Sequence, residues 1–350
     1  MTLEETISAI RPLDEEAMKE ARRRWDSIAK PLHSLGKMED LITQIAGITG
    51  ETQIDISKKG LVAMCGDNGV VEEGVTQSGQ EITALVANNF QAGISTVCVM
   101  CQQFGVDVHP VDVGMVTDTN VRTDLKVAYG TKNMTREPAM TREQAIRGIE
   151  AGIAMVKELK EKGYRILATG EMGIGNTTTS SAVASVLLHQ PVEVMTGRGA
   201  GLSSEGLVRK IQAIKKAIDL NQPDPEDAID VLAKVGGYDI AGMTGVFLGG
   251  AAFRIPVLMD GFISCVSALI AARICRDATP YMLASHVSKE PAAHLVLDSL
   301  GKDPVLHADM CLGEGTGAIA LIPFLEVGAK LYNSLSTFTD IHMDQYEELK

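Results

Sequence analysis

The sequence lacks the long apolar segments that mark export or membrane insertion. Its first residues, Met1 to Arg24, mix acidic and basic side chains at close spacing, unlike a signal peptide. No later segment is an uninterrupted apolar run of about 20 residues, the length that crosses a bilayer. We therefore expect a cytoplasmic protein with no membrane partner.

Positive charge is also scarce in this chain. It has 32 Lys and Arg against 45 Asp and Glu, a formal net charge of −13. Proteins bind nucleic acids largely through Lys and Arg contacts to phosphates. The balance argues against a nucleic-acid partner, and any anionic substrate needs a local cationic pocket.

Cysteines are few, and most lie within apolar runs. Six cysteines in 350 residues are typical of small core residues in a reducing compartment. Cys98 and Cys101 have the spacing of a redox or metal motif, but the two residues between them are apolar. Neither a second pair nor an adjacent His completes a metal site. We interpret this segment as the inside of a helix and predict no metal site.

The remaining composition is that of a folded globular protein, with 45% hydrophobic and 22% charged residues. The length suggests about two domains, although no obvious linker divides the chain. Short strand-like runs at 61–65, 106–113, 165–169, 255–259 and 281–284 alternate with helix-like segments at 3–29, 81–104, 142–162, 177–188, 203–220, 225–235, 262–274 and 315–335. This alternation predicts an α/β fold with a mainly parallel sheet and right-handed crossovers.

Five strand-like runs end in an acidic residue beside or near glycine. These acids are Asp67, Asp112, Glu171, Asp260 and Glu314. If the runs are parallel strands of one open sheet, all five carboxylates lie at the strands' carboxyl ends, where such sheets form their ligand crevice. This placement favours catalysis, although any one acid could instead cap a helix or hold a turn.

Two glycine-rich segments are candidates for a phosphate site. Residues 170–181 join a strand to a helix through glycines followed by hydroxyl side chains, and a helix N-terminus there can bind phosphate. Simple helix capping is the alternative. Residues 196–204 carry an arginine and are followed by Arg209 and Lys210, which could neutralise a phosphate. The second segment is not a complete dinucleotide fingerprint, and no Walker lysine motif occurs.

Small residues dominate 236–252, which predicts close approach of backbone to backbone or to a ligand; tight helix packing explains the pattern equally well.

His286 follows a predicted strand. An isolated His is more often capped or solvated, so we assign it no catalytic role.

Six segments, in order along the chain, resemble one enzyme family. They are Gly66–Val70, Glu73–Val75, Gly170–Thr178, Gly236–Asp239, Leu258–Phe262 and Leu312–Ala318, and Lys30–Gly36 also matches an early K-P-x-x-S-L-G segment. The family is that of the nicotinate-nucleotide:dimethylbenzimidazole phosphoribosyltransferases, which make the lower-ligand nucleotide of cobalamin. Each motif alone is weak, whereas six in the same order are specific.

The resemblance implies both a reaction and an architecture. The ribose 5-phosphate of nicotinate mononucleotide is transferred to 5,6-dimethylbenzimidazole with inversion at the anomeric carbon, giving α-ribazole 5′-phosphate and nicotinate. No metal or redox cofactor is implied. The implied fold is a Rossmann-like, mainly parallel sheet flanked by helices, with a small helical domain from both chain ends (1–30 plus 325–350) and a large α/β catalytic domain (31–324). The family also forms homodimers.

The same resemblance implies roles for individual residues. Glu314 is the general base, with apolar neighbours such as Leu312 raising its pKa, and Glu171 stands near the ribose and the reacting centre. The implied binding residues are Asn176, Thr177, Gly199, Ala200, Gly201 and Lys210 for the phosphate, Ser78 and Ser288 beside the base, and Asp260 as a buried site acid. Two positions depart from the family pattern: Asn68 stands where His is common, and Val86 where a Gln can border the base pocket.

Two other functions stay open. The same scaffold could use another acceptor, such as a phenol, a purine or water, and Val86 keeps this alternative open. A noncatalytic carrier or sensor of nicotinate mononucleotide or of a ribotide is the second, although Glu314 weighs against it. The incomplete fingerprint disfavours a dinucleotide-dependent dehydrogenase.

Overall fold

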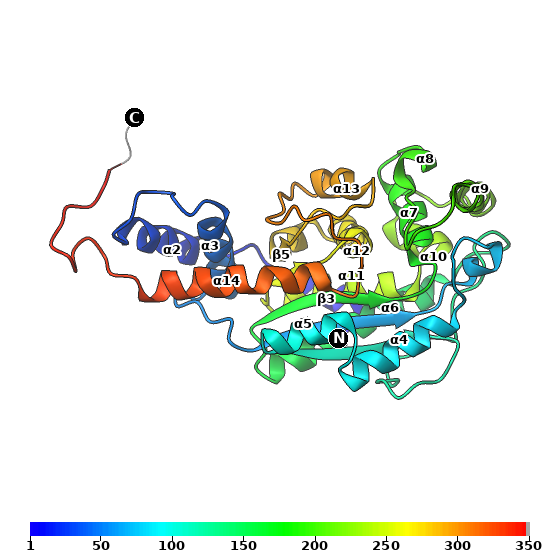
Figure 1. Cartoon of the computed structure of the whole chain (residues 1–350), viewed down its shortest axis with the longest axis horizontal. Helices are drawn as coiled ribbons and strands as arrows, with labels where there is room; N and C mark the ends of the chain where they lie inside the picture. Colours follow the sequence, from blue (N-terminus) through cyan, green and yellow to red (C-terminus); the bar gives the residue numbers. More distant parts are fainter. Residues whose placement is uncertain (348–350) are drawn as a thin grey trace.

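The computed structural model describes residues 1–347 of the chain (Figure 1). Its centre is a five-stranded sheet in the order β2-β1-β3-β4-β5, and every neighbouring pair is parallel. The strands are β1 (Lys59–Gly66), β2 (Val106–Gly114), β3 (Ile166–Met172), β4 (Val257–Met259) and β5 (Met282–Ala284). The predicted α/β fold with a mainly parallel sheet is confirmed.

The strand order reverses at β1. Strand β2 pairs with one edge of β1 and β3 with the other, so that Lys59 lies beside both Val106 and Ile166. All residues of β1 are buried, because helices cover both faces of the sheet. A parallel strand that is buried on both faces is apolar along most of its length. In doubly wound sheets the ligand crevice lies at such a reversal, outside the carboxyl ends of the strands.

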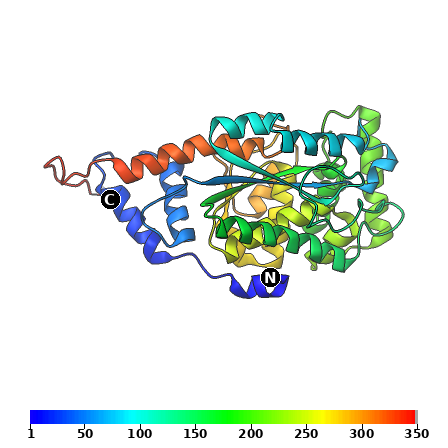
Figure 2. The same ribbon diagram turned by 90° about the horizontal axis from the view of Figure 1, so that it is seen from below.

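Helices form a layer on each face of the sheet (Figure 2). One layer holds α4 (Glu81–Ala92), α5 (Thr96–Gln103) and α14 (Thr316–Ser334). The other is centred on α11 (Tyr238–Ala252), with α6 (Arg142–Glu161) packed behind it. The remaining helices near the sheet are α1 (Leu3–Ala9), α7 (Asn176–Leu187), α8 (Val192–Met195), α9 (Ser204–Asn221), α10 (Ala228–Val235), α12 (Phe262–Ile274) and α13 (Ala293–Ser299), with short 3₁₀ turns η1 (Gly69–Glu73) and η2 (Arg276–Tyr281).

Helices α2 (Glu15–Ser27) and α3 (Lys37–Thr49), from the first part of the chain, meet the C-terminal helix α14 in a helical lobe beside the sheet (Figure 1). Helix α2 packs on α3, and α3 packs on α14. The rings of Trp25 and Tyr332 make an edge contact with centroids 5.1 Å apart. Helix α3, which was not predicted from the sequence, contributes to this lobe, whereas α1 contacts α6 and α11 instead. The predicted domain boundaries themselves stay a prediction.

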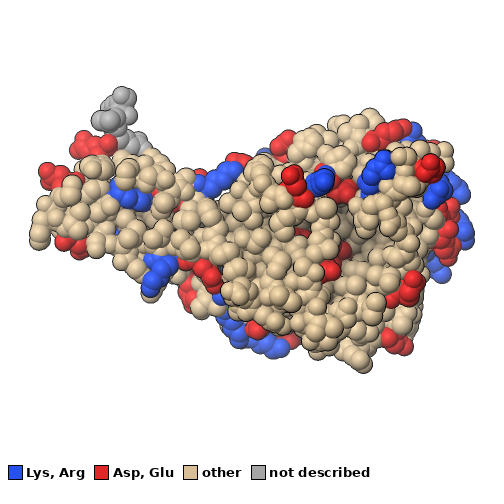
Figure 3. Space-filling model, in the orientation of Figure 1, with Lys and Arg blue, Asp and Glu red and all other residues tan. Residues whose placement is uncertain are grey.

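The predicted helix 81–104 is two helices. Gly93, with a left-handed φ of 73°, ends α4, and the Ser95 hydroxyl accepts a hydrogen bond from Cys98 N–H to begin α5. The stretch Glu81–Gln103 has the length and mean hydropathy (1.3) of a membrane-crossing helix. In the structure it is broken, and both parts contact β2. Its outer surface, in the part of Figure 3 that corresponds to α4 and α5, carries few charged atoms.

The strand expected before Glu314 is absent. Residues 308–313 form an irregular loop, and Cys311 and Leu312 are exposed. Because no neighbouring strand pairs with it, this apolar run cannot be a strand of the sheet. The fifth strand of the sheet is β5. Glu314 lies in the loop that precedes α14, at the carboxyl ends of the strands.

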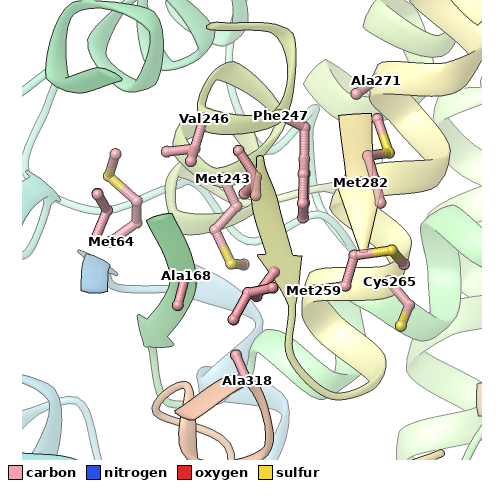
Figure 4. Packing of buried hydrophobic residues seen from close by; sticks show 14 of the residues in the cluster. Met64, Ala168, Met243, Val246, Phe247, Met259, Cys265, Ala271, Met282 and Ala318 are labelled. Carbon is pink, nitrogen blue, oxygen red and sulfur yellow. The ribbon is translucent and has the colours of Figure 1, made fainter. Parts of the chain in front are cut away.

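The small-residue segment forms α11, whose turns approach α6 closely. A Cβ added at Gly245 would collide with the Ile149 carbonyl oxygen, and one at Gly152 with that of Gly242. Tight helix packing therefore accounts for these glycines. On its other side α11 packs its Met243 and Phe247 side chains into the methionine-rich core of the sheet (Figure 4).

We expect Gly245→Ala to lower the melting temperature, because a methyl group forces α6 and α11 apart; overpacking of this kind costs about 1–3 kcal/mol. Gly79→Ala is the control, since its added methyl would meet only the flexible Glu81 side chain. Thermal unfolding followed by circular dichroism measures both. Equal melting temperatures for the two variants would contradict the close crossing.

Candidate active site

One pocket opens at the carboxyl ends of β1, β3, β4 and β5. Of the twelve site residues predicted from the sequence, ten line it: Ser78, Glu171, Asn176, Thr177, Gly199, Ala200, Asp260, Ser288, Leu312 and Glu314. The other two, Gly201 and Lys210, lie just behind its wall and bond to residues near the lining. The face in Figure 3 is hollowed, with acidic atoms visible inside the hollow. The tertiary fold thus gathers residues that are more than 200 positions apart.

Glu314 lies in a sharp turn with unusual backbone geometry. Gly313, Glu314 and Gly315 have φ angles of 89°, 61° and 95°, all in the left-handed region. Glycine adopts this region freely, whereas a residue with a Cβ pays a conformational cost, so surrounding contacts must hold Glu314 there. One such contact is its backbone N–H, which donates to Glu171 Oε1 at 3.2 Å.

Asp260 holds the rest of this turn. Its Oδ2 accepts a hydrogen bond from Gly315 N–H at 3.1 Å, and its Oδ1 accepts from Gly317 N–H at 2.7 Å and Ala318 N–H at 3.1 Å. A carboxylate on the first N–H groups of a helix also interacts favourably with the helix dipole. Asp260 therefore fixes the start of α14 to the end of β4, and Glu314 with it.

The Glu314 side chain has a free proton-accepting atom. Within residues 1–347, its buried Oε2 has no hydrogen-bond partner. Burial raises the pKa of Glu314, the negative charge of Asp260 adds to the increase, and a hydrogen bond from the Val97 backbone opposes it. Leu312 is 55% exposed, so the surrounding site as a whole, more than this one neighbour, causes the desolvation. A carboxylate of raised pKa with an unpaired oxygen is suited to accept a proton from a ligand.

A second acidic group lies deeper in the pocket. The Asn176 side-chain nitrogen donates to Glu171 Oε2 and, at 2.9 Å, to Asp239 Oδ2. Burial raises the pKa of Glu171 to about 8, with the charge of Asp239 as the next cause and the Asn176 hydrogen bond opposing. Burial likewise raises the pKa of Asp239 to about 7.

The N-terminus of α7 and the 197–201 loop form a cationic corner. Lys210 is fully buried, and its Nζ donates to Thr177 Oγ1 at 2.8 Å and to the Gly197 carbonyl at 3.1 Å. Burial lowers the Lys210 pKa to about 8, which the charge of Glu290 partly offsets. The left-handed Gly199 passes so close to Thr177 that a Cβ there would lie 2.8 Å from its hydroxyl. A helix N-terminus with a buried cation can bind a phosphate.

Two residues of the site were missed from the sequence. His286, to which no role was assigned, is 3% exposed on the pocket wall, with its Nδ1 3.0 Å from Ser285 Oγ. Burial lowers its pKa, against the effect of nearby Asp260, and favours the neutral ring. The feature of the sequence that could have identified His286 as a site residue is its position just after the strand β5. Asp239 was noted only as part of a motif, and nothing in the sequence indicates that it meets Glu171.

The two departures from the family pattern lie in different places. Asn68 is buried outside the pocket lining and donates to the Gly66 and Ile174 carbonyls at 3.5 and 3.4 Å, so it supports the glycine turn before α7. Val86 lines the pocket itself. Of the two, Val86 is therefore the residue that can contact a bound base.

The predicted helical position of Cys98 and Cys101 is confirmed, since both are buried in α5. In the described part of the chain, residues 1–347, no group of three His, Cys, Asp or Glu side chains is arranged to hold a metal.

The fold and pocket together define an α/β enzyme with a crevice at the switch point of a parallel sheet, where carboxylates face a site able to bind a phosphate. Comparison with known proteins gives the family. A phosphoribosyltransferase family model matches residues 10–342. The chain belongs to the nicotinate-nucleotide–dimethylbenzimidazole phosphoribosyltransferase family, as the resemblance in the sequence implied.

Individual relatives match 95–100% of the chain. The nicotinate-nucleotide–dimethylbenzimidazole phosphoribosyltransferase of Ruminiclostridium cellulolyticum is 47% identical over 352 residues and 100% of both chains. That of Acetivibrio thermocellus is 47% identical over 345 residues and 98% of each chain. The crystal structure of CobT from Thermus thermophilus is 34% identical, with a TM-score of 0.89 over 95% of this chain and 100% of that one.

The raised pKa of Glu171 predicts a pH-dependent cost to stability. Its pKa is about 8 in the folded protein and roughly 4.3 in an unfolded chain, so the folded state binds the proton more tightly. The stabilisation that this proton gives to the folded state is fully present when the pH is below the unfolded-state pKa. It is lost as the pH rises toward 8. Glu171→Gln cannot ionise and escapes this loss. The melting temperature of the variant minus that of the wild type should therefore increase from pH 5 to pH 8.5.

Differential scanning fluorimetry at matched ionic strength measures this difference. Glu137→Gln, at an exposed position that forms no ion pair within residues 1–347, is the control and should give a difference independent of pH. A flat difference for Glu171→Gln as well would show that Glu171 titrates normally.

Proposed function

We propose that this enzyme transfers the ribose 5-phosphate of nicotinate mononucleotide to 5,6-dimethylbenzimidazole, releasing nicotinate and forming α-ribazole 5′-phosphate for cobalamin synthesis. The substrates are those in the names of the full-length relatives. The observation that carries the proposal is the Glu314 carboxylate, which lies in the pocket with Oε2 buried and unpaired within residues 1–347.

In this reaction Glu314 is the general base. One benzimidazole nitrogen attacks the anomeric carbon while the other loses its proton to the Glu314 carboxylate, and the bond from that carbon to the pyridinium nitrogen breaks. Nicotinate leaves from a positively charged ring, so the electrons of the broken bond neutralise it and the leaving group needs no acid. A positioned base contributes about 10²–10⁴-fold to such a step.

The other pocket residues take supporting roles. Thr177, Gly199, Ala200 and Lys210 bind the phosphate, where the buried ammonium gives an otherwise acidic protein a local cationic corner. Gly201 anchors this loop, since its carbonyl accepts a hydrogen bond from Gln77.

Glu171 lies beside the reacting centre, close to Glu314 through the hydrogen bond between them. Ser78 and Ser288 border the base, and Asn176 and Asp260 hold the acids in place. We also propose a cytoplasmic location, which the six free cysteines favour.

The first test is to incubate the purified protein with nicotinate mononucleotide, with and without 5,6-dimethylbenzimidazole, and to identify products by mass. We expect nicotinate release and a ribotide only when the base is present. Nicotinate and free ribose phosphate without a base would indicate hydrolysis, and binding without turnover at high enzyme concentration would indicate a carrier. A panel of phenols and purines tests the wider acceptor range that Val86 leaves open.

We expect Glu314→Gln to retain the fold and to lose about 10²–10⁴-fold in kcat, because glutamine keeps the shape of the side chain and cannot take a proton. Glu226→Gln serves as a matched surface control with normal turnover. Steady-state kinetics and circular dichroism measure the two effects. Near-normal turnover of folded Glu314→Gln would exclude Glu314 as the base.

We propose that the enzyme is a homodimer and that α4 and α5 form part of the interface. Across Glu81–Gln103 the only charged residue is Glu81. Leu85, Ile94 and Val99 are 55%, 68% and 59% exposed on this segment. An uncharged helical face with exposed apolar side chains is typical of a surface that a partner covers.

The double substitution Leu85→Glu with Val99→Glu should convert the dimer to a monomer, since it places charges in an apolar contact. Leu220→Glu is the matched control, because Leu220 is 52% exposed on α9, away from this face. Size-exclusion chromatography with light scattering gives the mass of each. A wild-type monomer, or a double variant that stays dimeric, would contradict the proposed interface.

A further inference from the structure

Asp239 is a fully buried carboxylate next to the active-site pocket. It lies in the first turn of α11, and its Oδ1 accepts a hydrogen bond from Ile240 N–H at 3.0 Å. That contact alone would make it an ordinary acidic residue in the first turn of a helix, where the helix dipole favours negative charge. Its other oxygen, Oδ2, points to the Asn176 amide 2.9 Å away.

The Asn176 amide joins two acids. A side-chain amide nitrogen carries two hydrogens. Here one is donated to Asp239 and the other to Glu171 Oε2. Glu171 in turn accepts the Glu314 backbone N–H with its remaining oxygen. A continuous chain of hydrogen bonds therefore runs from α11, through α7 and β3, to the turn that carries Glu314.

The surroundings of this pair are acidic. Asp260 at the end of β4 and Glu314 before α14 face Glu171, Asp67 after β1 faces Asp239, and the buried Cys65 thiol of β1 lies near both. Within residues 1–347 no Lys, Arg or His forms an ion pair with Glu171 or Asp239, whereas the buried Asp112 of β2 is paired with Lys126 at 3.1 Å.

Two carboxylates in this position cannot both ionise at low cost. Burial penalises the charged form, and a like charge nearby penalises it further, so such acids hold a proton between them. The directions of the pKa shifts at both residues agree with this argument.

We propose that Asp239 is a positioning residue for Glu171: through the Asn176 amide it fixes the Glu171 carboxyl group and makes the two acids share one proton while the enzyme turns over. The shared proton leaves one net negative charge instead of two beside the reacting centre. Glu171 can then donate a hydrogen bond to a ribose hydroxyl in its protonated form. This catalytic consequence rests on the proposed function, whereas the coupling of the two acids does not.

The test uses the pH dependence of stability, which needs no substrate. In Asp239→Asn the side chain keeps its size and an oxygen acceptor and loses the charge, so the pKa of Glu171 should fall. The melting-temperature difference between Glu171→Gln and its parent should therefore stop rising and level off at a pH lower by about one unit or more in the Asp239→Asn background. Asp230→Asn, at a half-exposed position paired with Lys234, is the control background and should leave that pH unchanged.

If the melting-temperature difference levels off at the same pH in the Asp239→Asn background, the coupling is overturned, whatever the enzyme's substrate. Should Asp239→Asn fail to fold, carbon-13 NMR of the wild-type carboxyl groups replaces it. The resonance that Glu171→Gln removes should titrate in two steps, and a single step near pH 4 would overturn the proposal.

The catalytic consequence is measured separately. If the coupling and the proposed reaction both hold, Asp239→Asn shifts the Glu171-dependent limb of the pH profile of kcat to lower pH, and KM changes little. If Asp239 only stabilised the first turn of α11, Asp239→Asn would lower stability and leave this limb in place. A shift in stability without any ribotide product would keep the coupling and exclude the proposed function.

Discussion

The arrangement of the site depends on the Asp260 carboxylate at the N-terminus of α14. Three backbone N–H groups donate to it, and this cluster ties the end of β4 to the turn that presents Glu314. The turn is costly by itself, because a glutamate lies in the left-handed region between two left-handed glycines. The far end of α14 packs on α3, so the same helix connects the terminal lobe with the pocket.

The active site holds its acidic and basic side chains on opposite sides of the pocket. On one side lie buried carboxyl groups whose pKa values burial raises, among them Glu171 and Glu314. On the other lies the buried Lys210, whose pKa burial lowers. Each group is less readily charged than it would be in water, and a ligand that brings a proton to the acids and a phosphate to the lysine relieves both costs. The pocket is thus suited to a substrate that is anionic at one end and proton-donating at the other.

Much of the fold could be predicted from the sequence, and the failures have physical causes. The strands were recognised because a parallel strand buried on both faces is apolar throughout. The loop before Glu314 is also apolar, but it has no partner strand, so the same pattern gave a wrong strand there. The break at Gly93 was missed because one left-handed glycine ends a helix without changing the hydrophobic pattern around it. Among site residues, Asp239 was missed because its contact with Glu171 passes through Asn176, on a third element.

The sequence by itself determined the family, the alternation of strands and helices, and the chemical types in the site, because these depend on local pattern and on motifs in a fixed order. Only the tertiary structure decided which oxygens are satisfied and which is unpaired, since a hydrogen bond joins atoms that are distant along the chain. It decided that Asp260 acts on the backbone of α14, that Val86 and not Asn68 lines the pocket, and that His286 lies on its wall. Burial sets these roles through desolvation, and burial is a property of the packed molecule alone.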